Sequence, residues 1–287
     1  MNPSTPSPRR HRHPCRPAAA RGFTLVELMV GLVIAMLLMI ATSSVYLAQR
    51  RSYDTQGDVA DIQASARAIG QLLQREARQA GYSDFTYYGN DFGTAKPLDA
   101  TNDDGVNTSD SVTFRYFGSS KAGGDPTPGA VPASAPVADG SAVNCLGENV
   151  NGNFETVETF SVVNDAAGTP WLQCTVNGAP TPLFQGVEFF QVLLGEDTDN
   201  DDTINRYVPP GIANMGNVRA LRISMVLRGA ARSNPKPASF TLNHFGKGYA
   251  AADSAPAGDA GSVAALPDDG RLRKHISFYI AVRNRLN

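Results

Sequence analysis

The chain is poor in the residues from which many enzymes build their sites. Its 287 residues include only 4 histidines, 3 cysteines and 1 tryptophan. Beyond the N-terminal segment the histidines are His244, in a loop-like stretch, and His275, which we expect at the surface or at a strand edge. Neither a nucleophile elbow nor a phosphate-cradling glycine motif accompanies them. We therefore expect no enzymatic activity.

Positive charge is also scarce outside the N-terminal segment. The full chain has 25 basic and 27 acidic residues, a net charge of −2. Residues 1–22 contain no acid and five arginines, so the remainder has 25 − 5 = 20 basic against 27 acidic residues, a net charge near −7. A nucleic-acid-binding surface needs clustered positive charge. We therefore expect no nucleic-acid partner. The five arginines are Arg9, Arg10, Arg12, Arg16 and Arg21.

A long apolar run follows these arginines. Between Phe23 and Leu47 the one side chain expected to be charged is Glu27. Roughly 20 apolar residues at about 1.5 Å each span a bilayer, and flanking arginines stay on the cytoplasmic side. Residues 23–47 thus read as a membrane-spanning helix with its N-terminus inside the cell. The alternative is an ordinary secretory signal, cut after the run near residues 41–43.

The residues at the start of this run, Gly22-Phe23-Thr24-Leu25-Val26-Glu27, resemble the signal of type IV pilins and type II secretion pseudopilins. The resemblance implies that residues 1–22 are a leader, that a prepilin peptidase cuts after Gly22, and that Phe23 is then N-methylated. It also implies that Glu27 neutralises the amine of a neighbouring subunit. A buried carboxylate and a buried ammonium are each costly alone, and pairing offsets both costs. The alternative for Glu27 is a tolerated polar residue near the membrane interface.

Helical periodicity continues beyond the apolar run. Apolar residues recur at spacings of three and four from Val59 to Ala80, with polar side chains on the other face. Gly81 is a plausible C-terminal stop. We expect residues 48–81 to continue the helix and to pack one face on a globular domain. The apolar stripe is Val59, Ile62, Ala66, Ile69, Leu73, Ala77 and Ala80.

Residues 82–287 are predicted to form a β-rich domain outside the membrane. Alternating patterns predict several strands, and 187–194, apolar on both faces, predicts a central one. The expected fold class is α+β: a type IV pilin-like helix packed on a mostly antiparallel sheet. The stretches 118–140 and 250–268 are rich in small residues and predict mobile surface loops. The strand candidates are 111–117, 154–163, 171–176, 187–194, 221–227 and 276–282.

Two cysteines, Cys145 and Cys174, remain after the leader is removed. A pair of cysteines in a chain exported to an oxidising compartment favours a disulfide. A metal pair is the alternative, but neither cysteine has a second cysteine or a histidine at ligand spacing.

An acidic stretch follows the predicted central strand. Alternate oxygen-bearing side chains there resemble the ligand spacing of a calcium loop. The stretch departs from that pattern at Asp202, where glycine is usual, and at Val208, where a bidentate glutamate is usual. We expect either a calcium loop or a solvated acidic hairpin; no other cofactor is expected. The candidate ligands are Asp197, Asp199, Asp201, Thr203 and Asn205.

Several further segments resemble those of one group within these pilins, the PilW-like minor pilins. They are the helix end at 73–82, the stretch at 109–116, the segment at 186–208 and the C-terminal residues 281–286. The resemblance implies a subunit of the inner membrane, with its C-terminal domain in the periplasm, that primes pilus assembly with other minor pilins and the major pilin. It would then enter the extracellular filament, where the tip is one candidate position. The alternatives are a GspJ-like pseudopilin of type II secretion, a tip adhesin and a signal-anchored periplasmic enzyme.

Overall fold

The computed structural model describes residues 22–84, 90, 92–120, 137–152, 154–236 and 238–282. The leader up to residue 21, residues 121–136 of the predicted loop 118–140, and the C-terminal residues 283–287 lie outside the described part. The chain divides into two compact units, residues 1–50 and residues 51–287.

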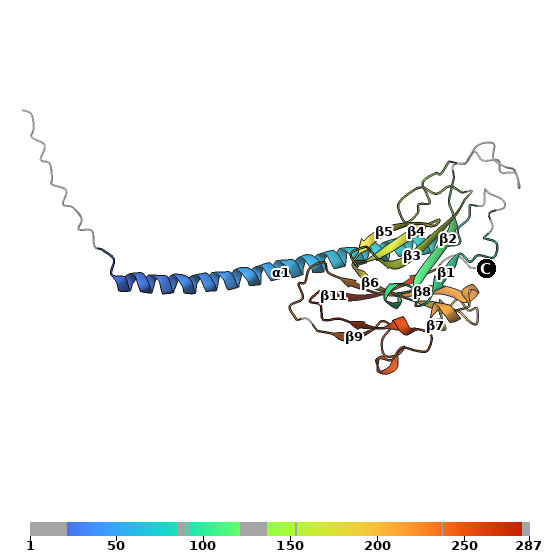
Figure 1. Cartoon of the computed structure of the whole chain (residues 1–287). Coiled ribbons are helices and arrows are strands. Elements are labelled where there is room, and N and C mark those ends of the chain that lie inside the picture. The colour runs from blue at the N-terminus through green and yellow to red at the C-terminus, as the bar shows by residue number, and fades with distance from the viewer. Residues whose placement is uncertain are drawn as a thin grey trace, which may run out of the picture. The chain divides into compact units, whose positions relative to one another are not determined.

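One α-helix, α1 (Leu25–Gln79), contains both predicted helical segments (Figure 1). Its residues up to Tyr53 are exposed. Within the second unit the apolar stripe is turned inward, and Ile69 and Leu73 are fully buried. The helix ends where Gly81 takes a φ of +76° and donates its N–H to the carbonyl of Arg115 (2.8 Å). Glycine adopts this left-handed conformation without steric cost.

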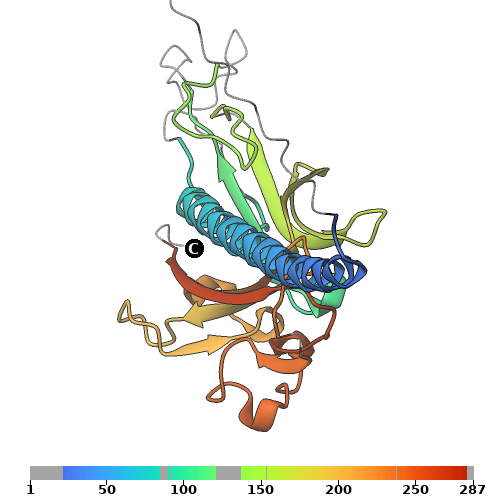
Figure 2. The ribbon, with the colours of Figure 1, turned by 90° about the vertical axis from the view of Figure 1, so that its left-hand side faces the viewer.

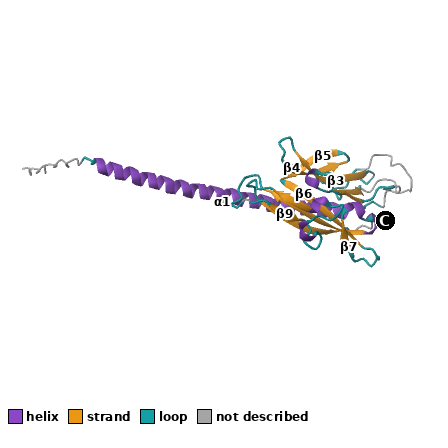
Figure 3. Ribbon diagram, turned by 60° about the horizontal axis from the view of Figure 1, so that its bottom comes forward, coloured by secondary structure: helices purple, strands orange, loops and turns teal. Residues whose placement is uncertain are grey.

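The strands form two larger sheets and a two-stranded ribbon, and every neighbouring pair is antiparallel. Figure 3 shows that strands make up most of the regular structure after α1. The five-stranded sheet runs β1 (Leu98–Thr101), β2 (Ser111–Phe117), β3 (Glu155–Asn164), β4 (Pro170–Val176), β5 (Ala179–Gln185). The four-stranded sheet runs β11 (Arg273–Ala281), β8 (Val218–Arg228), β6 (Val187–Glu196), β7 (Arg206–Val208). The ribbon is β10 (Val263–Leu266) with β9 (Phe240–Asn243). Short 3₁₀ turns are η1 (Val106–Thr108), η2 (Pro210–Ile212), η3 (Met215–Asn217), η4 (Ala251–Asp253) and η5 (Ala260–Ser262).

The core lies where α1 meets both larger sheets. The cyan part of α1 runs between the green and yellow strands of one sheet and the orange and red strands of the other (Figure 2). A single buried cluster joins Leu73 of the helix to Phe160 of β3 and Ile223 of β8. The α+β class with antiparallel strands on a long helix is confirmed. The strands nevertheless form two larger sheets, because the turn at Gly186 (φ +87°) leads the chain from β5 into β6 of the second sheet.

The stretch 250–268, predicted as a mobile surface loop, contains more regular structure than that prediction implies. This stretch contains η4, η5 and β10, and its Asp259 and Ser262 are buried. It is held against residues 102–110, where the Asp103 carboxylate accepts the N–H groups of Ala260 (2.6 Å) and Gly261 (2.7 Å). Its small residues therefore permit close packing. An added Cβ at Gly261 would lie 2.1 Å from the carbonyl oxygen of Thr108.

Candidate functional site

The N-terminal motif places Glu27 in the first turn of α1, one turn after Thr24. Glu27 Oε2 accepts the backbone N–H of Thr24 (2.9 Å) and its hydroxyl (3.0 Å). In return, Thr24 Oγ1 accepts the backbone N–H of Glu27 (3.2 Å). This reciprocal pair is a capping box, which satisfies N–H groups that a helix start otherwise leaves without partners.

The capping box adds a local partner that our sequence reasoning missed. That reasoning paired Glu27 only with a neighbouring subunit, whereas here its carboxylate has a partner three residues away. The signal was present in the sequence, since Thr24-Leu25-Val26-Glu27 follows the Ser/Thr-x-x-Glu pattern. Cleavage after Gly22 would leave Phe23 as the only residue before this cap.

Two hydroxyl groups of the apolar run hydrogen-bond to carbonyls within the helix. Thr42 donates to the carbonyl of Leu38 (2.8 Å), and Ser44 donates to the carbonyl of Ala41 (2.8 Å). By length and composition α1 is the one described helix able to cross a membrane, with a mean hydropathy of 2.5 in an 18-residue window. Such internal hydrogen bonding is what a lipid environment demands of polar groups.

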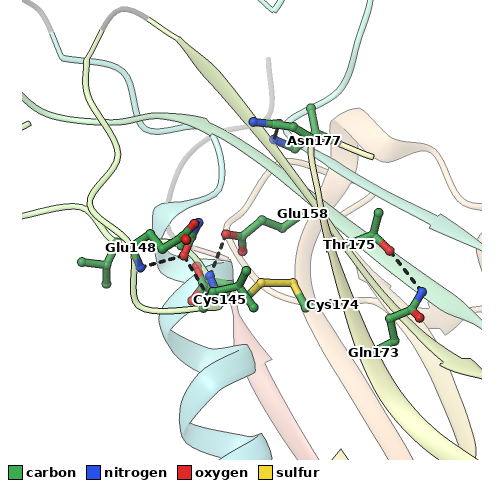
Figure 4. The surroundings of a disulfide bond; sticks show 12 residues. Cys145, Glu148, Glu158, Gln173, Cys174, Thr175 and Asn177 are labelled. Carbon is green, nitrogen blue, oxygen red and sulfur yellow. Dashed lines mark hydrogen bonds between the residues drawn. A yellow bond between two sulfur atoms is a disulfide. The ribbon is translucent and has the colours of Figure 1, made fainter. Parts of the chain in front are cut away.

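The predicted disulfide is present. Cys145 and Cys174 are bonded across a sequence separation of 29, with Cα atoms 6.7 Å apart (Figure 4). The bond ties the turn that contains Cys145 to β4 of the five-stranded sheet. Glu158 of β3 lies beside it and accepts the backbone N–H of Cys145 (2.8 Å).

A buried polar cluster adjoins the disulfide. Glu158 also accepts the hydroxyl of Tyr116 (2.8 Å), and it hydrogen-bonds Glu76 of α1. Both carboxyl groups are fully buried. Desolvation, followed by the charge of Glu158, raises the pKa of Glu76 well above its ordinary value, and desolvation also raises the pKa of Glu158. Arg75 offsets part of this cost, since its guanidinium lies 2.6 Å from Glu76. Sequence periodicity gave no sign of two acids meeting here.

The acidic stretch forms a turn between β6 and β7. The carboxylates of Asp197, Asp199 and Asp201 each have an oxygen within 4.8 Å of the others. Asp197 is buried and accepts the N–H groups of Asn200 (2.7 Å) and Asp202 (3.1 Å). Asp202 has a φ of +65°, the conformation for which glycine is usual.

The other two candidate ligands take part in this turn through hydrogen bonds. Thr203 donates its hydroxyl to Asp201 (2.5 Å), and Asn205 accepts the N–H of Thr198 (2.6 Å). Arg219 lies 3.8 Å from Asp197 and supplies a nearby positive charge. Three clustered carboxylates suit a hard cation such as calcium, and the calcium site stays a prediction.

The two histidines, which are far apart in sequence, lie together in the structure, and His275 is in the edge strand β11, as expected. The hydroxyl of Ser224 in β8 is 2.8 Å from His244 Nδ1 and 2.7 Å from His275 Nε2. His244 lies in the turn just after β9, as its loop-like sequence predicted, but it is buried, and desolvation lowers its pKa to about 3. Ser224 is fully buried. An imidazole with so low a pKa is a poor base at neutral pH, and the serine is closed to substrate.

Comparisons with known proteins give two family matches. Residues 159–284 match the family described as Type IV Pilus-assembly protein W. Residues 18–43 match the prokaryotic N-terminal methylation motif, which includes Gly22, Phe23 and Glu27. No curated protein sequence matches the chain. Among solved structures the chain is similar to a type IV-like pilin from Thermus thermophilus, at 16% identity and a TM-score of 0.44, over 79% of this chain and 98% of that one.

Proposed function

We propose that the chain is a PilW-type minor pilin, which primes assembly of the type IV pilus and enters the filament at or near its tip; the two family matches support this proposal. It is a structural protein and not an enzyme. The observation that carries the proposal is the N-terminal methylation motif joined to an apolar helix and a PilW-type domain. The motif implies processing by a prepilin peptidase.

The proposed sequence of events starts in the inner membrane. Residues 23–47, which include the first half of α1, anchor the protein in lipid, and the domain after them lies in the periplasm. Cleavage after Gly22 frees the amine of Phe23, which is then methylated. In the filament, Glu27 exchanges its bond to Thr24 for the amine of a neighbouring subunit, while other minor pilins and the major pilin contact the rest of the chain.

The first test compares Glu27→Ala with Glu27→Gln in cells that produce the pilus. A charge pair to the neighbour's amine requires the carboxylate, so both variants should be processed and methylated at Phe23 but be absent from sheared filaments. A neutral hydrogen bond would instead leave Glu27→Gln in the filaments. Mass spectrometry of the N-terminus measures processing and methylation, and immunoblots of sheared filaments measure incorporation. An N-terminus other than methylated Phe23 in native material would refute the proposal.

The second test separates the pilus from the competing GspJ-like pseudopilin and tip-adhesin roles. A deletion strain should lose surface pili and twitching motility while exoprotein release stays normal. Lost exoprotein release with normal pili would instead identify a type II secretion subunit. A strain with normal pili that fails only to attach to surfaces would identify an adhesin.

We also propose that calcium binds the turn containing Asp197, Asp199 and Asp201. The support is the mutual approach of three carboxylates, which repel one another unless a cation or water screens them. Calorimetry with calcium in the millimolar range should give a binding heat and raise the thermal midpoint. Asp199→Asn combined with Asp201→Asn should abolish both. Absence of heat and of any thermal shift in the native protein would refute the site.

A further inference from the structure

The edge strands of the two larger sheets differ in length and in proline content. Edge strand β1 has four residues and β7 has three, too short to template another chain. Edge strand β5 contains Pro180 and Pro182, which lack N–H groups. In contrast, β11 has nine residues, no proline and an unbroken register with β8. Within the described part of the chain, β11 is the long unprotected edge.

The backbone of β11 is oriented to accept another strand. Val282 donates its N–H to the carbonyl of Arg219 (2.8 Å), which continues the pairing of β11 with β8. N–H groups alternate in direction along an antiparallel strand. Those of Ser277 and Tyr279 therefore point away from β8, and no described strand lies on that side.

A groove of about 410 Å³ lies beside this edge, between β11 and α1. Figure 2 shows the red strand β11 beneath the cyan part of the helix. The strand contributes Ile276 and Phe278 to the groove, and the helix contributes Ala66 and Gly70. A Cβ added to Gly70 would meet nothing within 4 Å, so the space above this residue is open. The groove therefore offers apolar surface next to unpaired amides.

The charge of the groove is positive. Arg67 lines it, and none of its lining residues is acidic. Lys274 starts the row of β11 side chains that includes Ile276 and Phe278, because alternate residues share a face. The ion pairs of the described residues involve neither Arg67 nor Lys274. An acidic partner would complement both.

We propose that the β11 edge and this groove receive an extended segment of a different subunit of the same assembly. The segment adds a strand to β11, packs apolar side chains on Ala66 and Gly70, and carries an acid that meets Arg67 or Lys274. A second copy paired through its own β11 edge fits less well, since that edge and groove would bring another Arg67 and Lys274 and no acid. The inference rests on the proposed function, because it describes how a co-assembling subunit is bound.

Cross-linking in the producing cell tests the proposal. The photo-reactive residue p-benzoylphenylalanine replaces Gln71, which lines the groove and is exposed. The adduct should contain a different polypeptide, joined within an extended segment that includes an acidic residue. Ser277→Pro in this background removes one outward N–H without disturbing the pairing with β8. It should lower the adduct about ten-fold, the effect of roughly one lost hydrogen bond.

Two matched variants complete the design. Ser277→Ala keeps the N–H and should leave the adduct within about two-fold of the parent. Gly70→Leu fills the groove from the helix side, should also reduce the adduct, and should not lower the thermal midpoint, since leucine is the better helix former. Equal adduct in Ser277→Pro and Ser277→Ala, an adduct between two copies of this chain, or no adduct in the parent would each overturn the proposal.

The same samples keep this proposal separate from the proposed function. Mass spectrometry should find methylated Phe23 in the parent and in every variant, because none of the changes lies near the cleavage site. Loss of adduct with methylated Phe23 then reports on the groove. A parent chain without methylated Phe23 would instead refute the pilin assignment itself.

Discussion

The buried pair Glu76 and Glu158 places two carboxyl groups where water cannot reach either. One oxygen of Glu158 accepts from Tyr116 and from the N–H of Cys145, whereas Oε2 has no donor unless Glu76 keeps its proton. Two charged carboxylates in contact would repel strongly in a low dielectric. We therefore expect the pair to share a proton, which Glu76 holds and Glu158 accepts in a hydrogen bond.

This shared proton makes stability depend on pH. The unfolded chain releases the Glu76 proton near 4.5, whereas the folded protein retains it to higher pH because burial raises the pKa of Glu76. The free energy of unfolding should therefore fall as pH rises above about 4.5, by up to about 1.4 kcal/mol per pH unit, until Glu76 ionises in the folded state. Glu76→Gln keeps a donor toward Glu158 and has no proton to lose, so its decline should be shallower than that of the native protein. Burial also raises the pKa of Asp110, which therefore contributes to the slope of both proteins.

Urea denaturation of the native protein and Glu76→Gln at several pH values between 5 and 8 measures this difference. The exposed acid variant Glu148→Gln serves as the control and should follow the native slope. Parallel slopes for the native protein and Glu76→Gln would show that Glu76 is already ionised in the folded state.

At the scale of elements, Asp58 attaches α1 to the loop that follows β8. Its carboxylate accepts the hydroxyl of Ser233 (2.5 Å) and the N–H of Ala231 (3.3 Å). Gly229 approaches so closely that an added Cβ would lie 2.5 Å from the Asp58 carboxyl carbon. Thr55, one turn earlier, donates to the carbonyl of Ser233 (2.7 Å). This contact anchors the start of the packed half of the helix.

Asp58→Ala should therefore destabilise the domain. The substitution leaves the buried hydroxyl of Ser233 and the N–H of Ala231 without an acceptor, at a cost of about 1–3 kcal/mol. Asp61→Ala, which removes an exposed acid nearly one turn further on, should change stability by less than about 0.5 kcal/mol. Chemical denaturation of both variants gives the comparison, and equal midpoints would mean that Asp58 contributes no net stability.

The elements differ in how well the sequence predicts them. Alternation in 111–117 and 221–227 predicted β2 and β8, and apolar residues on both faces of 187–194 predicted β6, because one or both faces of these strands are buried. β5 escaped prediction because its two prolines argue against a strand, and only an edge position tolerates them. β9 and β10 are four residues each, too short for a periodic signal.

The functional residues divide in the same way. Local patterns predicted the processing motif and Glu27, since both depend on a few neighbouring residues. The cysteine pair was predicted because two cysteines remain once the leader is removed. The contacts of Ser224 with His244 and His275, and of Glu76 with Glu158, join residues from separate elements. Such contacts depend on the register of the sheets, which no single segment encodes.

At the scale of the whole molecule, the disulfide is the covalent link in a domain otherwise held by packing. It closes a loop of sequence separation 29 and joins the turn before β3 to β4. In the chain-entropy account such a loop stabilises the folded state by about 3–4 kcal/mol. Cys145→Ala combined with Cys174→Ala should lower the free energy of unfolding by that amount.

Denaturation with and without reductant provides the measurement. Reductant should bring the native protein to the stability of the double variant and leave the variant unchanged. Equal stability of the native protein and the double variant under oxidising conditions would show that the bond adds nothing to the folded domain.

The capping box at Thr24 and Glu27 affects the state of an unassembled subunit in the bilayer. Its acid is already occupied before any neighbour arrives. If the Glu27 carboxylate pairs with a neighbour's amine on assembly, it can form its hydrogen bonds to Thr24 again when the subunit leaves the filament. Growth and retraction would then exchange the Thr24 contact of Glu27 for the amine contact and back again. The carboxylate would have a partner in both states, so a released subunit could remain in the bilayer and be incorporated again.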